Sequence, residues 1–260
     1  MAVCIVSAAG GDWTVGGTYV GGVAPTSADD VLLDALSGSF VINTGAVGRS
    51  LDCELYTGQI THRAGVNLVL GDSIAGANNI ALRFSNAMSY IKENAATCSI
   101  TFVSTAATVQ DIYWGGKTTG NVTYNATSDG SWRYISDHYW TDYIATVTLT
   151  KGTLDTNSFN LKGGQFLLSN SNVRTLIMGA SVFDLSGVGN NCFMCATVTN
   201  LIVTANTAII KMYRSLACFA PLLQSATKDW NGMTVKFYGG GIQTFASGGN
   251  PTFYRVENNG

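Results

Sequence analysis

The feature that most constrains the fold of this chain is a short strand-and-turn pattern that repeats. From Thr148 to Gly187 the sequence is TLTKGTLDTNSFNLKGGQFLLSNSNVRTLIMGASVFDLSG. Apolar and polar residues alternate, the alternation stops at Gly or Asn, and then it begins again. Alternation with a period of two is typical of β-strands, and Gly and Asn favour the turns that join them. Because similar stretches occur along most of the chain and helical periodicity is nearly absent, the sequence predicts an all-β protein.

Four segments suggest how these strands are arranged, because each begins with a strand, passes a small residue and enters a second strand. They are Val147–Gly152, Thr175–Gly179, Leu201–Ala205 and Val235–Gly239. Their spacing of roughly 25 to 34 residues suits the coils of a β-solenoid, which bury their inward side chains against the coils above and below. About eight to ten coils would form a rod of about 40–50 Å, and we expect the four segments to lie one above another. A β-sandwich or jelly roll also has short strands with frequent turns, and it is the alternative.

The predicted domain organisation has two parts. Residues 1–30 form an N-terminal capping or docking segment, since the stretch Gly10–Gly22 is rich in Gly and holds a Trp. Residues 31–260 form one repetitive all-β domain. Within it, Ala77–Asn94 is the best candidate for a helix, but the same residues can form two short strands, IALRF and MSYIK.

Composition limits the possible partners of this 260-residue chain. Charged residues make up 12% of the sequence and the formal net charge is −2. The protein therefore has no positive electrostatic field to attract nucleic acid or an anionic membrane surface. No segment approaches the length of about 18 apolar residues that a membrane helix needs. The opening residues MAVCIVSAAGGDW lack a basic region before a short apolar run, so we expect no signal peptide.

Two motifs carry a resemblance to a known class of proteins. Gly152–Asn157 (GTLDTN) and Ser171–Leu176 (SNVRTL) resemble repeats of β-helical bacteriophage tail and fibre proteins, and of similar bacterial surface adhesins, although Ser158 stands where glycine is usual. The opening GGDWTVGGTYVGGVAPTSADDVLLD also looks like the start of such phage structural proteins.

The resemblance implies a structural component of a tailed bacteriophage virion, in a tail fibre, collar, baseplate or capsid-attached fibre. Such a protein is synthesised in the host bacterial cytoplasm, forms a homo-oligomer that is usually a trimer, and contacts other virion proteins. The alternatives are a receptor-binding or polysaccharide-degrading spike, whose partner would be a host-surface glycan, and a bacterial surface adhesin.

The repeat motif has its own physical interpretation. Gly152 and Asn157 tolerate the positive φ that a corner between sheets requires. The side chains of Asp155 and Asn157 can bond nearby backbone amides. Thr148, Thr150 and the aliphatic stem of Arg174 are expected on an outer face.

The most aromatic stretch, SWRYISDHYWTDY at Ser131–Tyr143, provides the candidate ligand-binding residues. Exposed aromatic rings can stack on sugars while a neighbouring carboxylate holds hydroxyl groups, so a glycan-binding patch could include the following residues: Trp132, His138, Tyr139 and Trp140. The other interpretation places Trp132, Tyr134 and Trp140 in the core or in a subunit interface.

Two acidic pairs are candidates for catalytic chemistry. Asp52 and Glu54 lie at positions i and i+2 of one strand, where their carboxyl groups could be roughly 6 to 7 Å apart, as in an inverting glycosidase. The alternative, which we favour, is a solvated face opposite inward residues, namely Leu51, Cys53 and Leu55. Asp29 and Asp30 precede an apolar strand and are predicted to cap a turn or strand.

The remaining signals argue against an enzyme. The chain has only two histidines, His62 and His138, and it contains no GxxxxGK[ST], HExxH or GxSxG motif. The pair Cys192 and Cys195 lacks nearby partners for a metal, so it is predicted to be structural. The six cysteines are scattered and are expected to be reduced: Cys4, Cys53, Cys98, Cys192, Cys195 and Cys218. We therefore expect no catalytic residues, no metal and no cofactor.

Overall fold

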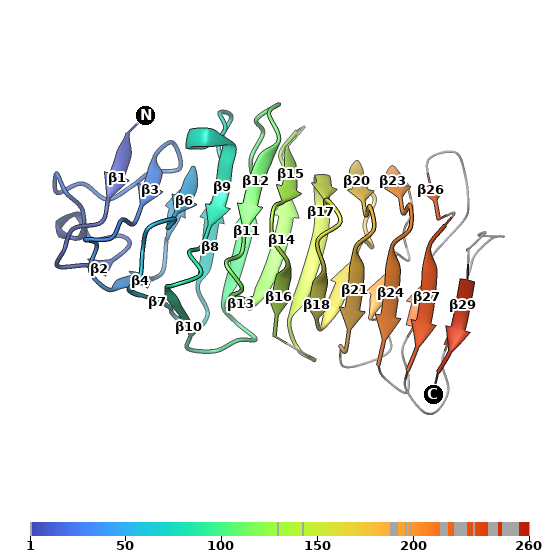
Figure 1. The fold of residues 1–260 in the computed structure, drawn as a ribbon. Coiled ribbons are helices and arrows are strands. Elements are labelled where there is room, and N and C mark those ends of the chain that lie inside the picture. Colours follow the sequence, from blue (N-terminus) through green and yellow to red (C-terminus); the bar gives the residue numbers. More distant parts are fainter. Residues whose placement is uncertain are drawn as a thin grey trace.

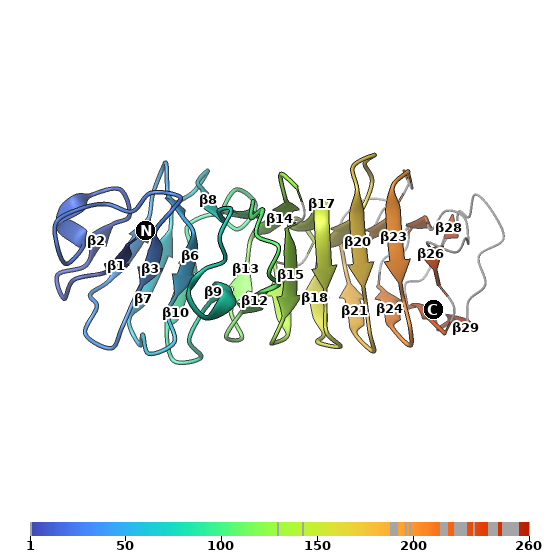
Figure 2. The same ribbon diagram turned by 90° about the horizontal axis from the view of Figure 1, so that it is seen from above.

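The computed structural model shows a chain wound into a β-solenoid of about 9 turns. The structure describes residues 2–128, 130–141, 143–187, 192–195, 197, 199–213, 218–220, 228–230, 232–238, 244–245 and 255–259. Parallel strands lie side by side along an elongated body, with the first and last coils at opposite ends (Figures 1 and 2). Among these residues, no helix has the length and apolar character needed to span a bilayer.

Each coil contributes strands to three faces of the solenoid. The first face contains β1 (Val3–Ile5), β3 (Asp30–Leu32), β6 (Ser50–Asp52), β9 (Ile80–Arg83), β12 (Gln110–Tyr113), β15 (Ser131–Tyr134), the end of β17 (Thr146–Asp155), β20 (Arg174–Ile177), β23 (Leu201–Thr204) and β26 (Lys228–Asp229). The third face contains β5 (Val47–Gly48), β8 (Asn67–Leu70), β11 (Ser99–Phe102), β14 (Asn121–Asn125), the start of β17, β19 (Gln165–Leu167), β22 (Phe193–Met194), β25 (Cys218–Ala220) and β28 (Thr244–Phe245).

The second face consists of two separate sheets. The first is formed by β2 (Gly11–Asp12), β4 (Phe40–Ile42), β7 (Gln59–His62) and β10 (Ser89–Lys92). The other is formed by β13 (Thr118–Thr119), β16 (His138–Trp140), β18 (Leu161–Gly163), β21 (Val182–Leu185), β24 (Ile209–Met212), β27 (Thr234–Phe237) and β29 (Arg255–Asn258). Two 3₁₀ turns complete the elements, η1 (Gly16–Thr18) and η2 (Ala77–Asn79).

The core is a column of side chains stacked in register. On the third face one inward row runs through successive strands from β8 to β19, and its members are at most 1% exposed: Leu68, Ile100, Val122, Val147 and Phe166. Aromatic rings stack in the same way, since the rings of Phe102 and Tyr124 lie 5.2 Å apart and 9° from parallel. Each coil therefore buries its apolar surface only with the help of its neighbours.

The predicted solenoid is thus confirmed, but the predicted alignment of its coils is only partly right. Thr175 pairs with Ile202, so Thr175–Gly179 and Leu201–Ala205 do lie one above the other. The other two segments were placed on the wrong face. Val147 pairs with Phe166 on the third face, and Val235 pairs with Ile210 on the second.

The cause of this error is the shape of β17. The strand crosses from the third face to the first near Gly152, which has a φ of 100°. Residues after Gly152, beginning with Thr153, therefore form the partner of Thr175. Inward and outward residues alternate in the same way on all three faces, so a pattern of alternation cannot tell one face from another.

Other local predictions have mixed outcomes. The segment at 77–94 forms two strands, Ile80–Arg83 and Ser89–Lys92, as its second interpretation required. Asn157 has a φ of 50°, and its backbone amide is bonded by Asp155 Oδ1 at 2.7 Å, as predicted. The side chain of Asn157 instead donates to the carbonyl oxygen of Tyr134 at 3.1 Å, so its predicted bond to an amide is wrong. Thr148 and Thr150 are half-buried, between inward neighbours.

The prediction for Arg174 is wrong, because its side chain is 0% exposed. Its guanidinium donates to four backbone carbonyls at a corner between coils: those of Leu168 (2.8 Å), Asn172 (2.7 Å), Thr199 (2.9 Å) and Thr197. Carbonyls that turn inward at a corner have no strand partner, and the planar fork of an arginine can satisfy several of them. Burial lowers the pKa of this guanidinium.

Residues 1–30 pack against the following coil instead of extending from it. Trp13 is fully buried, its ring lies 5.3 Å from that of Phe40, and its Nε1 donates to the carbonyl of Val47 at 2.9 Å. The Tyr19 hydroxyl donates to the carbonyl of Trp13 at 2.8 Å. β1 also pairs with β3, so this segment supplies the first coil of the column.

The close packing of coils predicts that Gly163→Ala will destabilise the protein. A Cβ at Gly163 would lie 2.4 Å from the ring of Trp140, which is itself buried. Overpacking of this kind costs about 1–3 kcal/mol, which a shift of the urea unfolding midpoint would measure. Gly17→Ala is the matched control because a Cβ there meets no atom within 4 Å. Equal midpoints for the two variants would contradict the stacking of coils at Gly163.

Candidate functional site

The aromatic stretch in β15 and β16 lies mostly in the core. Trp132 and His138 are 0% exposed and Trp140 is 2% exposed, because alternate residues of the two strands point inward. The ring of His138 stacks on that of Trp114 with centroids 3.9 Å apart. Buried rings cannot stack on a sugar, so three of the four candidate ligand-binding residues are unavailable. The alternative interpretation, that Trp132, Tyr134 and Trp140 belong to the core, matches their burial.

A buried chain of hydrogen bonds explains how a histidine is accommodated there. His138 Nε2 lies 3.1 Å from Thr119 Oγ1, and His138 Nδ1 lies 3.0 Å from the hydroxyl of Tyr134. That hydroxyl lies 2.8 Å from the hydroxyl of Tyr124. Burial lowers the pKa of His138 well below its usual value, so the ring is neutral at pH 7. These hydrogen bonds satisfy the buried polar groups of His138, Tyr134 and Tyr124, and they stabilise the core without contact with solvent.

Tyr139 is the candidate residue that the structure places on the surface. It lies on the outer side of β16, half-buried, and its hydroxyl donates to Asp137 Oδ2 at 3.3 Å. Burial, and then the negative charge of Asp137, raise the pKa of Tyr139. Two hollows open beside it, of about 550 Å³ and about 260 Å³. Lys162, Asp184 and Lys211 lie in the smaller hollow, and sequence analysis did not single them out.

The pair Asp52 and Glu54 forms an ion-pair cluster. Arg83 Nε donates to Asp52 Oδ1 at 2.8 Å, and Arg83 Nη2 lies 2.9 Å from Glu54 Oε2. Leu51 and Cys53 point inward as predicted, but Leu55 is 66% exposed because the strand ends at Asp52 and the chain turns. Arg83 contacts both carboxylate oxygens of Asp52. A general acid or base must have a carboxylate oxygen free to exchange a proton with the substrate, so this arrangement suits an ion pair better than catalysis.

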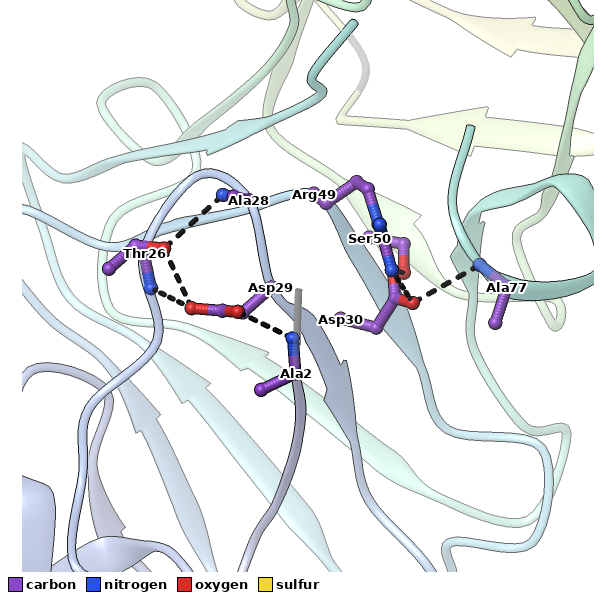
Figure 3. Close-up of polar contacts among 8 residues, drawn as sticks. All are labelled: Ala2, Thr26, Ala28, Asp29, Asp30, Arg49, Ser50 and Ala77. Atoms are coloured by element: carbon purple, nitrogen blue, oxygen red, sulfur yellow. Dashed lines mark hydrogen bonds and ion pairs between the residues drawn. The ribbon is translucent and has the colours of Figure 1, made fainter. Parts of the chain in front are cut away.

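Asp29 caps a turn near the N-terminal end of the rod, as predicted. Its Oδ1 accepts from the amide of Ala2 at 2.8 Å (Figure 3). Its Oδ2 accepts from the amide of Thr26 at 3.0 Å and from the Thr26 hydroxyl at 2.6 Å. These bonds, of which the one from the Thr26 hydroxyl has the largest effect, lower the pKa of Asp29. The carboxylate therefore fixes the turn and joins it to β1.

Asp30 joins three coils through a buried ion pair that sequence analysis did not foresee. Its side chain is 6% exposed and that of Arg49 is 4% exposed. Arg49 Nε donates to Asp30 Oδ1 at 2.8 Å, the Ser50 hydroxyl donates to the same oxygen at 2.5 Å, and the amide of Ala77 donates to Oδ2 at 3.3 Å (Figure 3). Burial alone would raise the pKa of Asp30, but the bonds from Arg49 and Ser50 and the charge of Arg49 outweigh it, so the pKa is lowered.

Cysteines and histidines do not form a metal site in the described part of the chain, where no three His, Cys, Asp or Glu side chains gather closely enough. Cys192 and Cys195 are both fully buried in the core. Burial raises the pKa of the Cys53 thiol well above its usual value. His62 is also buried, with Nε2 3.1 Å from the carbonyl of Val66 and a pKa lowered by burial to about 4. The side chain of Cys218 lies outside the described residues.

The fold and these sites define a β-solenoid in which buried polar groups such as His138, Asp30 and Arg174 bond to other groups of the chain. The charged side chains that solvent can reach lie on its outer faces. A scan of protein-family models, a search of curated proteins and a search of solved structures found no match to this chain.

The buried ion pair predicts a large effect for Asp30→Asn. The change leaves the Arg49 guanidinium buried without a counter-charge, which costs about 3–5 kcal/mol of unfolding free energy in denaturant unfolding. The matched control is Asp111→Asn, whose partner Arg133 is 44% exposed and whose loss should be at most about 1 kcal/mol.

The same pair predicts how the effect of Asp30→Asn changes with pH. Because the folded pKa of Asp30 is lowered, its stabilisation is complete above the unfolded value of about 3.9 and is lost as pH falls through the folded value. The difference between wild type and Asp30→Asn should therefore shrink below about pH 4. A difference that stays constant between pH 7 and pH 3 would contradict an ionised Asp30.

Proposed function

We propose that this chain is a non-enzymatic structural component of a tailed-bacteriophage virion, acting as a rigid scaffold or attachment protein. The observation that carries the proposal is the core of stacked coils, in which the described buried residues from Cys4 to Phe237 form one cluster along an elongated body. The resemblance of the GTLDTN and SNVRTL motifs to phage fibre repeats supplies the virion context. The buried His138, Cys53 and Cys195 have no access to a substrate, which agrees with a scaffold.

The N-terminal end of the rod is the surface that we propose for docking onto other virion proteins. Val15, Val20 and Val23 lie in the loops of the first coil and are 51%, 67% and 68% exposed. Exposed apolar residues that lie together mark interaction sites more often than isolated ones do. The proposed assembly is a homo-oligomer, with a trimer as the expected form.

A receptor-binding function is the second candidate, and one observation favours it. Tyr139 and its charged neighbours line two open hollows on the outer side of the second face. A passive scaffold does not need such a surface.

The scaffold proposal predicts that the protein is found in purified particles of the phage that encodes it. Mass spectrometry of particles purified from a lysate, with labelled antibody in electron microscopy, would measure its presence. The double variant Val20→Asp and Val23→Asp should lower its amount in particles at least about tenfold, because two charges oppose burial of the docking surface. Val173→Asp is the matched control, since Val173 is 61% exposed and lies directly before β20, seven coils from β1. Absence of the wild-type protein from particles would refute the virion role, and normal incorporation of the double variant would refute docking through this end.

A further inference from the structure

The outer side of the second face carries an unusual row of side chains. Tyr139, Lys162, Asp184 and Lys211 occupy register positions on four successive strands, β16, β18, β21 and β24. These strands lie side by side in Figure 1. Adjacent members of the row are therefore about 4.8 Å apart along the rod, and the whole row spans about 14 Å. We refer to these four residues as the Tyr–Lys row.

Two hollows follow the Tyr–Lys row and share Tyr139 and Lys162. The larger, of about 550 Å³, also has Thr118, Thr141 and Tyr143 in its lining. The smaller, of about 260 Å³, continues past Asp184 to Lys211. Because the two hollows have Tyr139 and Lys162 in common, they lie next to each other along the row.

The two lysines of the row have no acceptor for their ammonium groups among the described residues. In other lysines with described side chains the amine is engaged: Lys92, Lys117 and Lys151 donate to backbone carbonyls and Lys236 pairs with Glu257. Lys162 and Lys211 make no such contact, although both face the same hollow. They are two coils apart, or about 10 Å along the rod, with Asp184 between them.

Tyrosine rings lie at both ends of the row. Tyr143 is 47% exposed beside Tyr139 in the larger hollow. At the other end Tyr213 is 41% exposed, its ring lies 4.9 Å from that of Tyr238 at an angle of 12°, and its hydroxyl donates to Asp184 Oδ2 at 3.4 Å. Tyrosine presents an apolar ring face and a polar tip, which suits a ligand that has both kinds of surface.

This combination fits one chemical class of ligand. A sugar ring offers an apolar face to tyrosine and hydroxyl donors to a carboxylate such as Asp184. Carboxylate groups repeated along a chain would meet Lys162 and Lys211 in charge-assisted hydrogen bonds. The backbone of DNA fits less well, because its phosphodiester groups offer only acceptor oxygens and so no hydrogen-bond donor for Asp184, whereas the hydroxyl groups of a sugar provide donors.

We propose that the Tyr–Lys row binds an acidic oligosaccharide, a chain of uronic acid residues laid along the rod axis across β16, β18, β21 and β24. The rings of Tyr139 and Tyr213 stack on sugar faces, the ammonium groups of Lys162 and Lys211 bind sugar carboxylates, and Asp184 accepts hydrogen bonds from hydroxyls. This proposal rests on the receptor-binding candidate, whose hollows it uses, and gives the chemical class of the ligand. The scaffold role does not depend on it, because an isolated chain has the site whether or not it enters a particle.

The test is titration calorimetry of the full chain with oligomannuronate and oligogalacturonate, each of six residues. Maltohexaose is the uncharged comparison. The wild-type chain should bind at least one of the two uronates, at least about tenfold more tightly than maltohexaose, and binding should weaken as salt is raised. Failure to bind either uronate, or equal binding of maltohexaose, would overturn the proposal.

Variants locate the site. Tyr139→Ala, and separately Lys162→Gln with Lys211→Gln, should each weaken uronate binding at least about tenfold. The matched controls are Tyr113→Ala on the first face and Lys151→Gln on the third face, which should leave affinity unchanged. A thermal unfolding midpoint equal to that of the wild type shows that a variant is folded. If a variant of the Tyr–Lys row has a lower midpoint, the single variant Lys162→Gln takes its place, because the side chain of Lys162 is exposed. Full affinity in the folded row variants, or an equal loss in the controls, would refute the site.

Discussion

The structure depends on one constraint, which is that parallel strands in successive coils hold like side chains directly above one another. A single coil cannot bury its own apolar face, so Leu154 is buried because Leu176 lies above it and Val203 above that. The same constraint explains the intolerance predicted at Gly163 and the packing of Trp13 over Phe40 at the first coil. Loss of register in one coil would remove the partner of the next.

The corners between faces are where this constraint is hardest to meet. Backbone groups at a corner leave the ladder, and buried charged side chains satisfy some of them: Arg174 donates to carbonyls of two coils, while Asp30 accepts from Arg49, Ser50 and the amide of Ala77. Such groups stabilise the corners from within. The outer faces carry solvent-exposed charges and rings. Among the side chains that the structure describes, the cations without a partner are the two lysines of the Tyr–Lys row.

The sequence predicts the solenoid because alternation and turn residues report the local backbone. The sequence does not predict which face a strand occupies, because apolar and polar residues alternate with the same period on all three faces. For this reason Val147 and Val235 were assigned to the wrong faces. For the same reason, Trp132, His138 and Trp140 were candidates for the surface although they point inward. Lys162, Asp184 and Lys211 were missed because they come together only through coil register, and their separation in sequence, one coil each, is the signal that could have found them.

The most direct test of the stacked column is to place spin labels along the rod and to measure the distances between them by electron–electron double resonance. A label at Thr204→Cys is paired with one at Asp111→Cys, four coils away, or at Val3→Cys, eight coils away. Stacked coils predict backbone separations of about 19 Å and about 38 Å, in a ratio of two. The unlabelled control is the wild type, whose cysteines with described side chains are buried. Two similar distances, or a shorter one for Val3, would contradict a continuous column.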